Sequence, residues 1–239
     1  MIVSSNNNYS SIEEQILIEF QHISDFIWKS HNLISQEKER EDTIYDLYTS
    51  EGSDNLLEIA DMRLKYESFK IDKVFPYLIN ISNLFTIISI LEYNLLKLAK
   101  TVEKLDNSIM LENINGSGIN KLFKYFRQRN INLETIDKFT QIQASIKIRN
   151  CFFHANGMLM WSKDNIELLN IVKNKTYYTK GFGDNFDNDD AKKWNIKIIE
   201  SDLGEQLELT HYYTFMLTGY VRDFLKELCH ILGDKYEQS

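Results

Sequence analysis

The stretch Ser145-Ile-Lys-Ile-Arg149-Asn150-Cys-Phe-Phe-His154-Ala-Asn-Gly157 decides the predicted fold of this chain. It is the only place in the sequence where a His follows an Arg at a distance of five to seven residues. The apolar residues in and before it keep one helix face, and they are Phe139, Ile142, Ile146 and Phe153. Arg149 falls in that apolar stripe, and Gln143, Lys147, Asn150 and His154 form the polar stripe beside it. The pattern predicts a long helix that Asn132 caps and Gly157 ends.

An Arg, a polar residue and then a His four residues later resembles the ribonuclease motif of the HEPN family. The side chains suit that chemistry, because imidazole moves protons near neutral pH. Guanidinium offers planar, bidentate donors to the charge that builds on phosphorus. The alternative is structural: Arg149 forms an interface ion pair and His154 caps the helix end, where the macrodipole favours a cation.

The resemblance implies a role for each motif residue. Arg149 would hold the scissile phosphate, and His154 would exchange protons with the 2′-hydroxyl or the leaving 5′-oxygen. Asn150 would orient His154 or donate to phosphate, unless it is an ordinary solvent-facing residue. Arg149 and His154 diverge by about 140° on one ideal helix. The family solves this by bringing two motif helices together across a homodimer, so we expect a composite site at a twofold axis.

Glu92 is the best match to an acidic residue that many HEPN nucleases place on the helix packed against the motif helix. It would orient Arg149 through a bidentate pair. A buried Glu needs a partner, and Arg149 is a cation in need of one. The competing interpretation is an exposed Glu92 paired with Lys97 or Lys100.

The densest basic cluster lies just upstream of the motif helix. Phe123, Tyr125 and Phe126 are interleaved with it, either as core residues or as stacking partners for unpaired bases. We expect the basic side chains to grip RNA phosphates, together with Lys147 of the polar stripe. The cluster consists of Lys121, Lys124, Arg127 and Arg129.

Composition limits the function further. The 239 residues carry a net charge of −8, which does not indicate a nucleic-acid binder, so any RNA contact must come from a local patch. Cys151 and Cys229 offer neither a disulfide framework nor metal-ligand spacing, and no cofactor motif is present. These features predict a cytoplasmic protein without cofactor or metal. We also expect no membrane contact, since the apolar stretch at residues 75–91 contains Asn80, Ser82 and Asn83 and suits a buried core helix.

The sequence predicts a mainly α fold with a small antiparallel β insertion before the C-terminal helix, and the resemblance implies that its helical bundle is HEPN-like. After a disordered leader at residues 1–11, residues 12–239 form one domain. Its parts are a bundle at 12–157, short strands with an acidic loop at 158–209, and a C-terminal helix at 210–233. The acidic loop at 181–190 has Asp spacing that suggests calcium, but a solvated loop fits better because the Gly and Glu of an EF-hand are missing. Expected helices cover 12–33, 37–48, 56–66, 76–105, 119–129 and 132–157, and expected strands cover 158–161, 166–172, 194–199 and 206–209.

The resemblance implies a metal-independent endoribonuclease that acts on RNA as a homodimer in a bacterial toxin or phage-defence setting. A catalytically silent HEPN-like module for dimerisation, regulation or RNA binding is the alternative. A third possibility is the inhibited subunit of a toxin–antitoxin pair, held by an antitoxin or another regulatory protein. Some family toxins carry a Tyr two residues after the His, where a partner enzyme modifies it. Asn156 stands there in this chain, which argues against that route of control.

Overall fold

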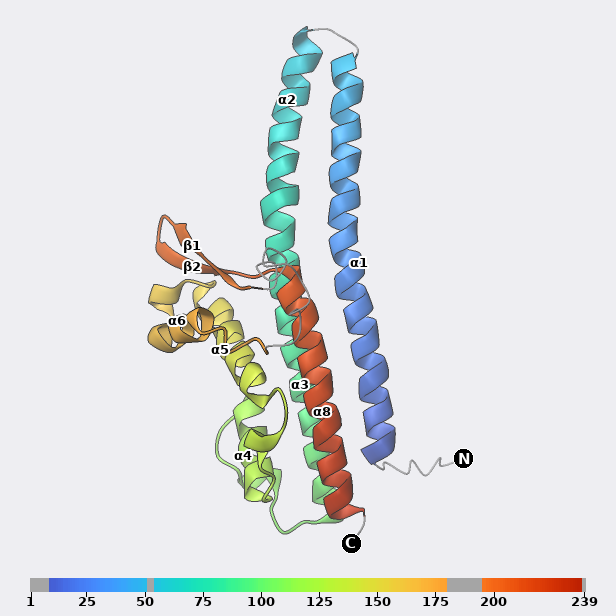
Figure 1. Cartoon of the computed structure of the whole chain (residues 1–239), viewed down its shortest axis with the longest axis vertical. Helices are drawn as coiled ribbons and strands as arrows, with labels where there is room; N and C mark the ends of the chain where they lie inside the picture. The colour runs from blue at the N-terminus through green and yellow to red at the C-terminus, as the bar shows by residue number, and fades with distance from the viewer. Residues whose placement is uncertain (1–8, 51–53, 180–194, 238–239) are drawn as a thin grey trace.

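The computed structural model describes residues 9–50, 54–179 and 195–237. The chain is mainly helical, with 79% of it in helices, and it has a small two-stranded antiparallel sheet before the C-terminal helix. Three long helices form the body, and a layer of shorter helices lies against one side (Figure 1). The main helices are α1 (Tyr9–Ser50), α2 (Asp54–Phe69), α3 (Phe75–Leu105), α4 (Gly118–Gln128), α5 (Phe139–Ala155), α6 (Asn165–Lys173) and α8 (His211–Tyr236).

Short elements join these helices. The strands β1 (Lys197–Ser201) and β2 (Gly204–Glu208) form a hairpin whose register pairs Ile198 with Leu207. The 3-10 turns are η2 (Leu111–Asn113), η3 (Leu133–Thr135) and η4 (Leu159–Trp161). A π-helix, η1 (Lys70–Val74), links α2 to α3, so Pro76 lies just inside α3 without interrupting the helix.

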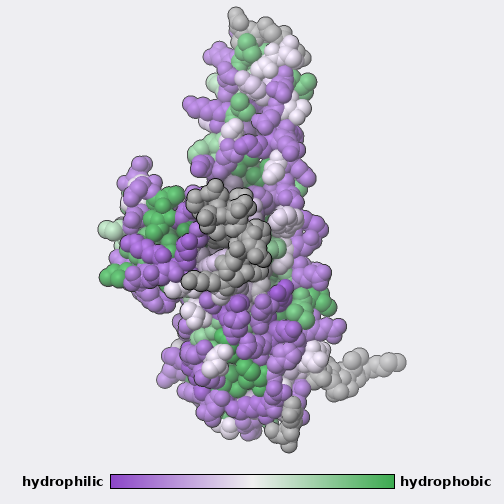
Figure 2. Space-filling model, in the orientation of Figure 1, coloured by the Kyte–Doolittle hydropathy of each residue, from purple (hydrophilic) through white to green (hydrophobic). Residues whose placement is uncertain are grey.

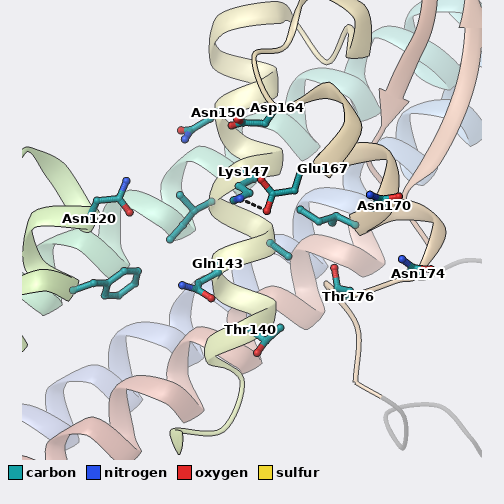
Figure 3. Close-up of a pocket in the computed structure, with 14 residues that line it drawn as sticks. Asn120, Thr140, Gln143, Lys147, Asn150, Asp164, Glu167, Asn170, Asn174 and Thr176 are labelled. Atoms are coloured by element: carbon teal, nitrogen blue, oxygen red, sulfur yellow. Dashed lines mark ion pairs between the residues drawn. The ribbon is translucent and has the colours of Figure 1, made fainter. Parts of the chain in front are cut away.

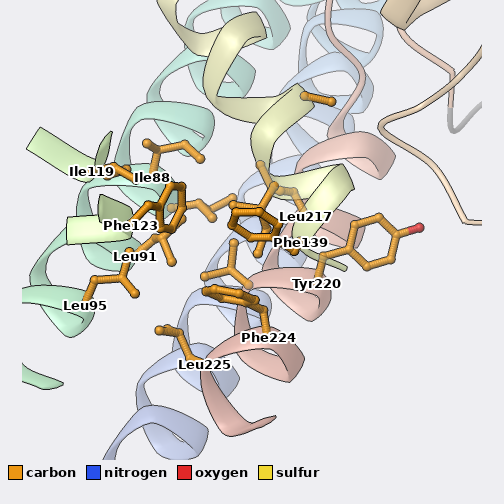
Figure 4. Packing of buried hydrophobic residues seen from close by; sticks show 14 of the residues in the cluster. Ile88, Leu91, Leu95, Ile119, Phe123, Phe139, Leu217, Tyr220, Phe224 and Leu225 are labelled. Carbon is orange, nitrogen blue, oxygen red and sulfur yellow. The ribbon is translucent and has the colours of Figure 1, made fainter. Parts of the chain in front are cut away.

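The core gathers around α8, whose period-3.6 stripe is fully buried as the sequence predicts. Aromatic rings from three helices meet there: Phe139 of α5 lies 5.1 Å from Phe123 of α4 and 5.8 Å from Phe224 of α8 (Figure 4). Phe123 and Phe126 are therefore core residues and are not available to stack on bases. The α8 stripe consists of Leu217, Val221, Phe224, Leu228 and Leu232.

α3 is the central helix that the sequence predicts for the apolar stretch. Leu84, Ile87, Ile88 and Leu91 have no exposed surface. Asn80 is also buried, and its Nδ2 donates to the Leu209 carbonyl at 2.9 Å. By length and composition alone the continuous helix at residues 55–105 would also suit a membrane span, a weak criterion that core helices of water-soluble proteins meet as well.

Several predicted element boundaries are wrong. Residues 9–11 belong to α1 and not to a leader, while residues 1–8 and the acidic loop at 181–190 lie outside the described part. Residues 166–172 lie within the α6 helix, and the predicted strand at 158–161 is largely the η4 turn, although Met158 makes one bridge to Gln206. A run of four to eight apolar residues does not separate a strand from a short helix.

Candidate functional site

α5 carries the predicted motif, and it begins later than the sequence suggests. Asn132 precedes the η3 turn, and α5 starts at Phe139 after Lys138, whose φ is 65°. The other end agrees with the prediction. Asn156 adopts a left-handed conformation at φ 50°, and the Gly157 amide donates to the Cys151 carbonyl at 3.3 Å. The Asn156 amide also donates to the Phe152 carbonyl at 3.0 Å, and the two bonds close the last turn as a Schellman motif.

Gly157 fixes the end of the motif helix against the β hairpin. Its φ is +80°, and a Cβ there would lie 2.8 Å from a ring carbon of Phe152. Its carbonyl accepts from the Leu207 amide at 2.9 Å. Nearby, the Tyr77 hydroxyl donates to Asn156 Oδ1 at 2.6 Å. α3 and β2 thus hold the segment that follows His154.

The core-facing side of α5 differs from the predicted apolar stripe. Ile142, Ser145, Ile148 and Phe152 are buried, whereas Phe153 is 63% exposed. Arg149 therefore lies at the border between core and solvent, not in the core. This position removes most of the desolvation cost that an apolar stripe would have imposed on its charge.

Arg149 is held by two aromatic rings. Its guanidinium carbon lies 5.7 Å from the Phe85 ring and 5.5 Å from the Phe153 ring, both within cation–π range. Nη1 donates to Asn150 Oδ1 at 2.9 Å. Nε is buried and has no hydrogen-bond partner among the described residues. Stacking on the two rings positions the guanidinium, and some of its N–H groups remain without an acceptor and could bind an anion.

His154 lies at the exposed end of α5. Its ring meets the ring of Phe153 edge to face at 4.9 Å. No hydrogen bond to His154 is present within the described ranges, and Asn150 bonds to Arg149 instead of orienting His154. The imidazole is accessible to a substrate, and no residue that the structure describes fixes its tautomer.

Glu92 does not pair with Arg149 in this structure. Phe85 of α3 lies opposite Arg149, and Glu92 is seven residues further on, about 10 Å along the helix. Glu92 instead faces the start of α4, where its Oε1 lies 3.5 Å from the position of a Cβ on Gly118. A carboxylate there complements the positive end of the α4 dipole. The predicted alternative pairing is also absent, since Lys97 bonds to Gln15 and Lys100 to Glu103.

The predicted basic cluster does not form one surface. Arg129 is 3% exposed and bonds to Asp106, Ser108 and the Ile109 carbonyl, so it holds the α3–α4 loop and cannot contact RNA. Arg127 donates twice to Glu134, at 2.7 and 3.0 Å. Lys121 and Lys124 have no carboxylate partner in the described part of the chain.

A groove of about 420 Å³ runs along the polar stripe of α5, between α4 and α6 (Figure 3). Lys147 lies in it and is paired with Glu167 of α6, while Asp164 adds a second carboxylate. The charge of Lys147, which was predicted to contact RNA, is therefore already neutralised by a carboxylate of the same chain. Carboxamides dominate the remaining polar lining: Asn120, Gln143, Asn150, Asn170 and Asn174.

The described part of the chain contains no evident set of ligands for a metal ion. No group of three or more His, Cys, Asp or Glu side chains is close enough to hold an ion. Cys151 and Cys229 are both buried, and burial raises the pKa of each thiol. A high thiol pKa disfavours the thiolate that nucleophilic or ligand chemistry requires.

Phe85 and Phe153, which contact Arg149, were not predicted from the sequence. One signal was available, because Phe153 follows Arg149 by one helical turn and residues at that spacing touch. Phe85 has no local signal, since its contact depends on how α3 packs against α5. The same holds for Glu167, which reaches Lys147 only because α6 forms where a strand was expected.

Comparisons of the chain with protein-family models, curated proteins and solved structures found no match.

Proposed function

We propose that this protein is a metal-independent endoribonuclease of the HEPN type, acting as a homodimer in a bacterial toxin or phage-defence setting. The observation that carries the proposal is that an arginine and a histidine, Arg149 and His154, lie near the same end of α5. The charge of Arg149 rests on two rings with no carboxylate partner in the described part of the chain, and His154 is exposed one turn further along. A guanidinium in that state can still bind a phosphodiester.

The proposed chemistry needs only these side chains. An imidazole takes the proton from the 2′-hydroxyl, whose oxygen attacks phosphorus, and the 5′-oxygen leaves with a proton. The products are a 2′,3′-cyclic phosphate and a 5′-hydroxyl. Arg149 would stabilise the charge on the phosphoryl oxygens. Because no described residue of its own chain orients His154, a twin α5 from another copy is the source we propose.

A silent module is the second candidate, and a specific observation favours it. Lys147 and Arg127 are paired with carboxylates, and Arg129 is buried. Little basic surface is left around α5 for phosphate contacts in a chain whose net charge is −8. In this alternative Arg149 and His154 contribute to a protein contact and no RNA is cut.

The deciding experiment compares RNA cleavage by wild type and His154→Ala in excess chelator. The proposal expects cleavage by wild type, with cyclic-phosphate ends, and a rate lower by about 10²–10⁴-fold in the variant. His230→Ala is the matched control, because His230 is a largely exposed imidazole on α8. Wild-type cleavage that appears only after divalent metal is added would refute the mechanism, and a pure protein with no cleavage would favour the silent module.

A further inference from the structure

The groove along α5 has an apolar floor. We use this name for the hydrophobic side chains that line it, which α4, α5 and α6 all contribute. The volume of about 420 Å³ falls within the range of roughly 300–1,000 Å³ that small-molecule sites occupy. A flat group of moderate size therefore has an apolar surface to lie on. The floor consists of the buried Phe123, Ala144 and Ile171 and the half-buried Ile146.

The rim of the groove carries neutral amides with spare hydrogen-bonding capacity. Four carboxamides of the lining are exposed, and their side chains form no hydrogen bond with another residue that the structure describes. Each of them offers two donor hydrogens and an acceptor oxygen without a charge. A ligand whose edge places donors beside acceptors would satisfy them. The four rim amides are those of Asn120, Gln143, Asn170 and Asn174.

The charges in the groove disfavour a phosphate. Lys147 is the one cation among the described residues that line it, and its charge is taken up by Glu167. Asp164 adds a second carboxylate, so the lining carries more negative than positive charge. An anionic group in the groove would be repelled at close range. The groove therefore suits a neutral ligand.

One end of the groove reaches the candidate site. Figure 3 shows Asn150 at this end and Thr140 at the other. Asn150 Oδ1 accepts from Arg149 Nη1 at 2.9 Å, so a guanidinium lies directly beside the groove. In a nucleotide a charged phosphate and a neutral base are joined through the sugar in the same relation. The base has apolar faces and polar edges, and Figure 2 shows hydrophobic and hydrophilic side chains mixed on the part of the molecule that holds α6 and the hairpin.

We infer that the groove binds an unpaired adenine of single-stranded RNA, with a neighbouring phosphate at Arg149. The inference rests on the proposed function and adds the base that the site prefers. Asn and Gln side chains pair with adenine through two hydrogen bonds, one from the amide nitrogen to N7 and one from N6 to the amide oxygen. Unpaired bases expose these edges, and proteins that recognise single-stranded RNA bind them in this way.

The carboxylates of the groove favour adenine over uracil. Adenine carries an amino group at the position where uracil carries a carbonyl oxygen. Asp164, which has no cation beside it in the described part of the groove, can accept from the amino group and repels the carbonyl oxygen. The floor contacts the face of either ring, so the edge decides the preference.

Binding of an RNA that cannot be cleaved tests the inference. Short fluorescein-labelled oligomers of 2′-O-methyladenosine and of 2′-O-methyluridine lack the attacking hydroxyl and stay intact. Fluorescence anisotropy should show that wild type binds the adenine oligomer about tenfold more tightly than the uracil oligomer, because one bidentate pair discriminates between bases by that order. Equal affinities for the two oligomers would overturn the inference.

A double variant locates the preference in the groove. Gln143→Leu with Asn170→Leu removes two rim amides and keeps side chains of similar size. Both positions are exposed, so helix content and thermal midpoint should match wild type. The preference for adenine should disappear. Gln21→Leu with Gln36→Leu, which replaces two exposed amides of α1, is the matched control and should keep it. A preference that survives in the groove variant would overturn the inference.

Competition identifies the source of the base. Adenosine monophosphate should displace the adenine oligomer only at concentrations at least about tenfold higher than an unlabelled oligomer, because it lacks the neighbouring nucleotides. Displacement at an equal or lower concentration would assign the groove to a free nucleotide and overturn the inference. The two proposals fail separately, since these oligomers are not substrates. An inactive wild type that still prefers adenine would refute the nuclease alone, and cleavage without a base preference in binding would refute the groove assignment alone.

Discussion

The imidazole rings of His31 and His211 stack face to face, with 3.6 Å between their centroids and 11° between their planes. Burial, and then the neighbouring His31, lower the pKa of His211 to about 4, and burial also lowers the pKa of His31. The two rings line a cavity between α1, α3 and the start of α8, and the charged residues that also line it, Lys197 and Glu208, pair with each other at 3.4 Å. Both rings are therefore neutral at pH 7, which lets them stack without repulsion.

We predict that acid destabilises the protein through this pair. The unfolded chain takes up a proton on His211 near pH 6.5, whereas the folded chain resists it until about pH 4. The unfolded state therefore binds more protons across that window, and stability falls as pH drops through it. Thermal midpoints measured from pH 7 to pH 4 should decline less steeply in His211→Phe than in wild type. Equal slopes in His211→Phe and wild type would contradict the prediction.

Gly157→Ala should lower stability. The residue sits at φ +80°, and its new Cβ would meet the Phe152 ring at 2.8 Å and the Leu207 carbonyl at 3.2 Å. Left-handed strain of this kind costs on the order of 1–3 kcal/mol. Urea denaturation would measure the decrease. Gly219→Ala is the control, because nothing lies within 4 Å of its Cβ position, and it should match wild type or exceed it slightly.

Arg149→Ala should lower stability moderately without unfolding the protein. Glu92 is not its partner, so the substitution leaves no buried carboxylate unpaired. It removes two cation–π interactions and the hydrogen bond to Asn150, which together stabilise the fold by about 1–3 kcal/mol. The cleavage rate, in contrast, should fall by about 10²–10³-fold under the nuclease proposal. A collapsed thermal midpoint together with an inactive wild type would favour a structural role.

Glu167→Gln should strengthen RNA binding. The substitution removes the carboxylate that neutralises Lys147 and leaves a side chain of the same size in the groove. A freed Lys147 adds one phosphate contact, which should steepen the dependence of log affinity on log salt by up to about one unit. Fluorescence anisotropy with single-stranded RNA at several salt concentrations measures this. Lys147→Ala combined with Glu167→Gln should return binding to the wild-type level, and no gain in the single variant would exclude Lys147 as a phosphate ligand.

Helical periodicity predicted the bundle well and the local contacts poorly. The stripe of α8 and the apolar stretch of α3 are confirmed as core, because burial of an entire face leaves a strong periodic signal. The strand predicted for residues 166–172 is wrong, because Ile-Glu-Leu-Leu-Asn-Ile-Val suits either a short helix or a strand. Its true state follows from packing against α5 and η4.

The candidate site shows the same division between local and long-range information. The helix end at Gly157 and the helical placement of Arg149 and His154 could be predicted from the sequence. The partners of Arg149, Lys147 and Arg129 could not, because Phe85, Glu167 and Asp106 reach them from other helices or loops. For charged side chains at helix borders, the tertiary partner decides whether a charge is free or neutralised.

The π-helix between α2 and α3 makes residues 55–105 one uninterrupted rod, about 75 Å long. One end of this rod is the start of α2, and near its middle Phe85 supports the guanidinium of Arg149. The wider turn of the π-helix, where each residue is less tightly wound, is the natural place for such a rod to bend. A bend there would tilt α2 against α3 while leaving the Phe85 contact in place.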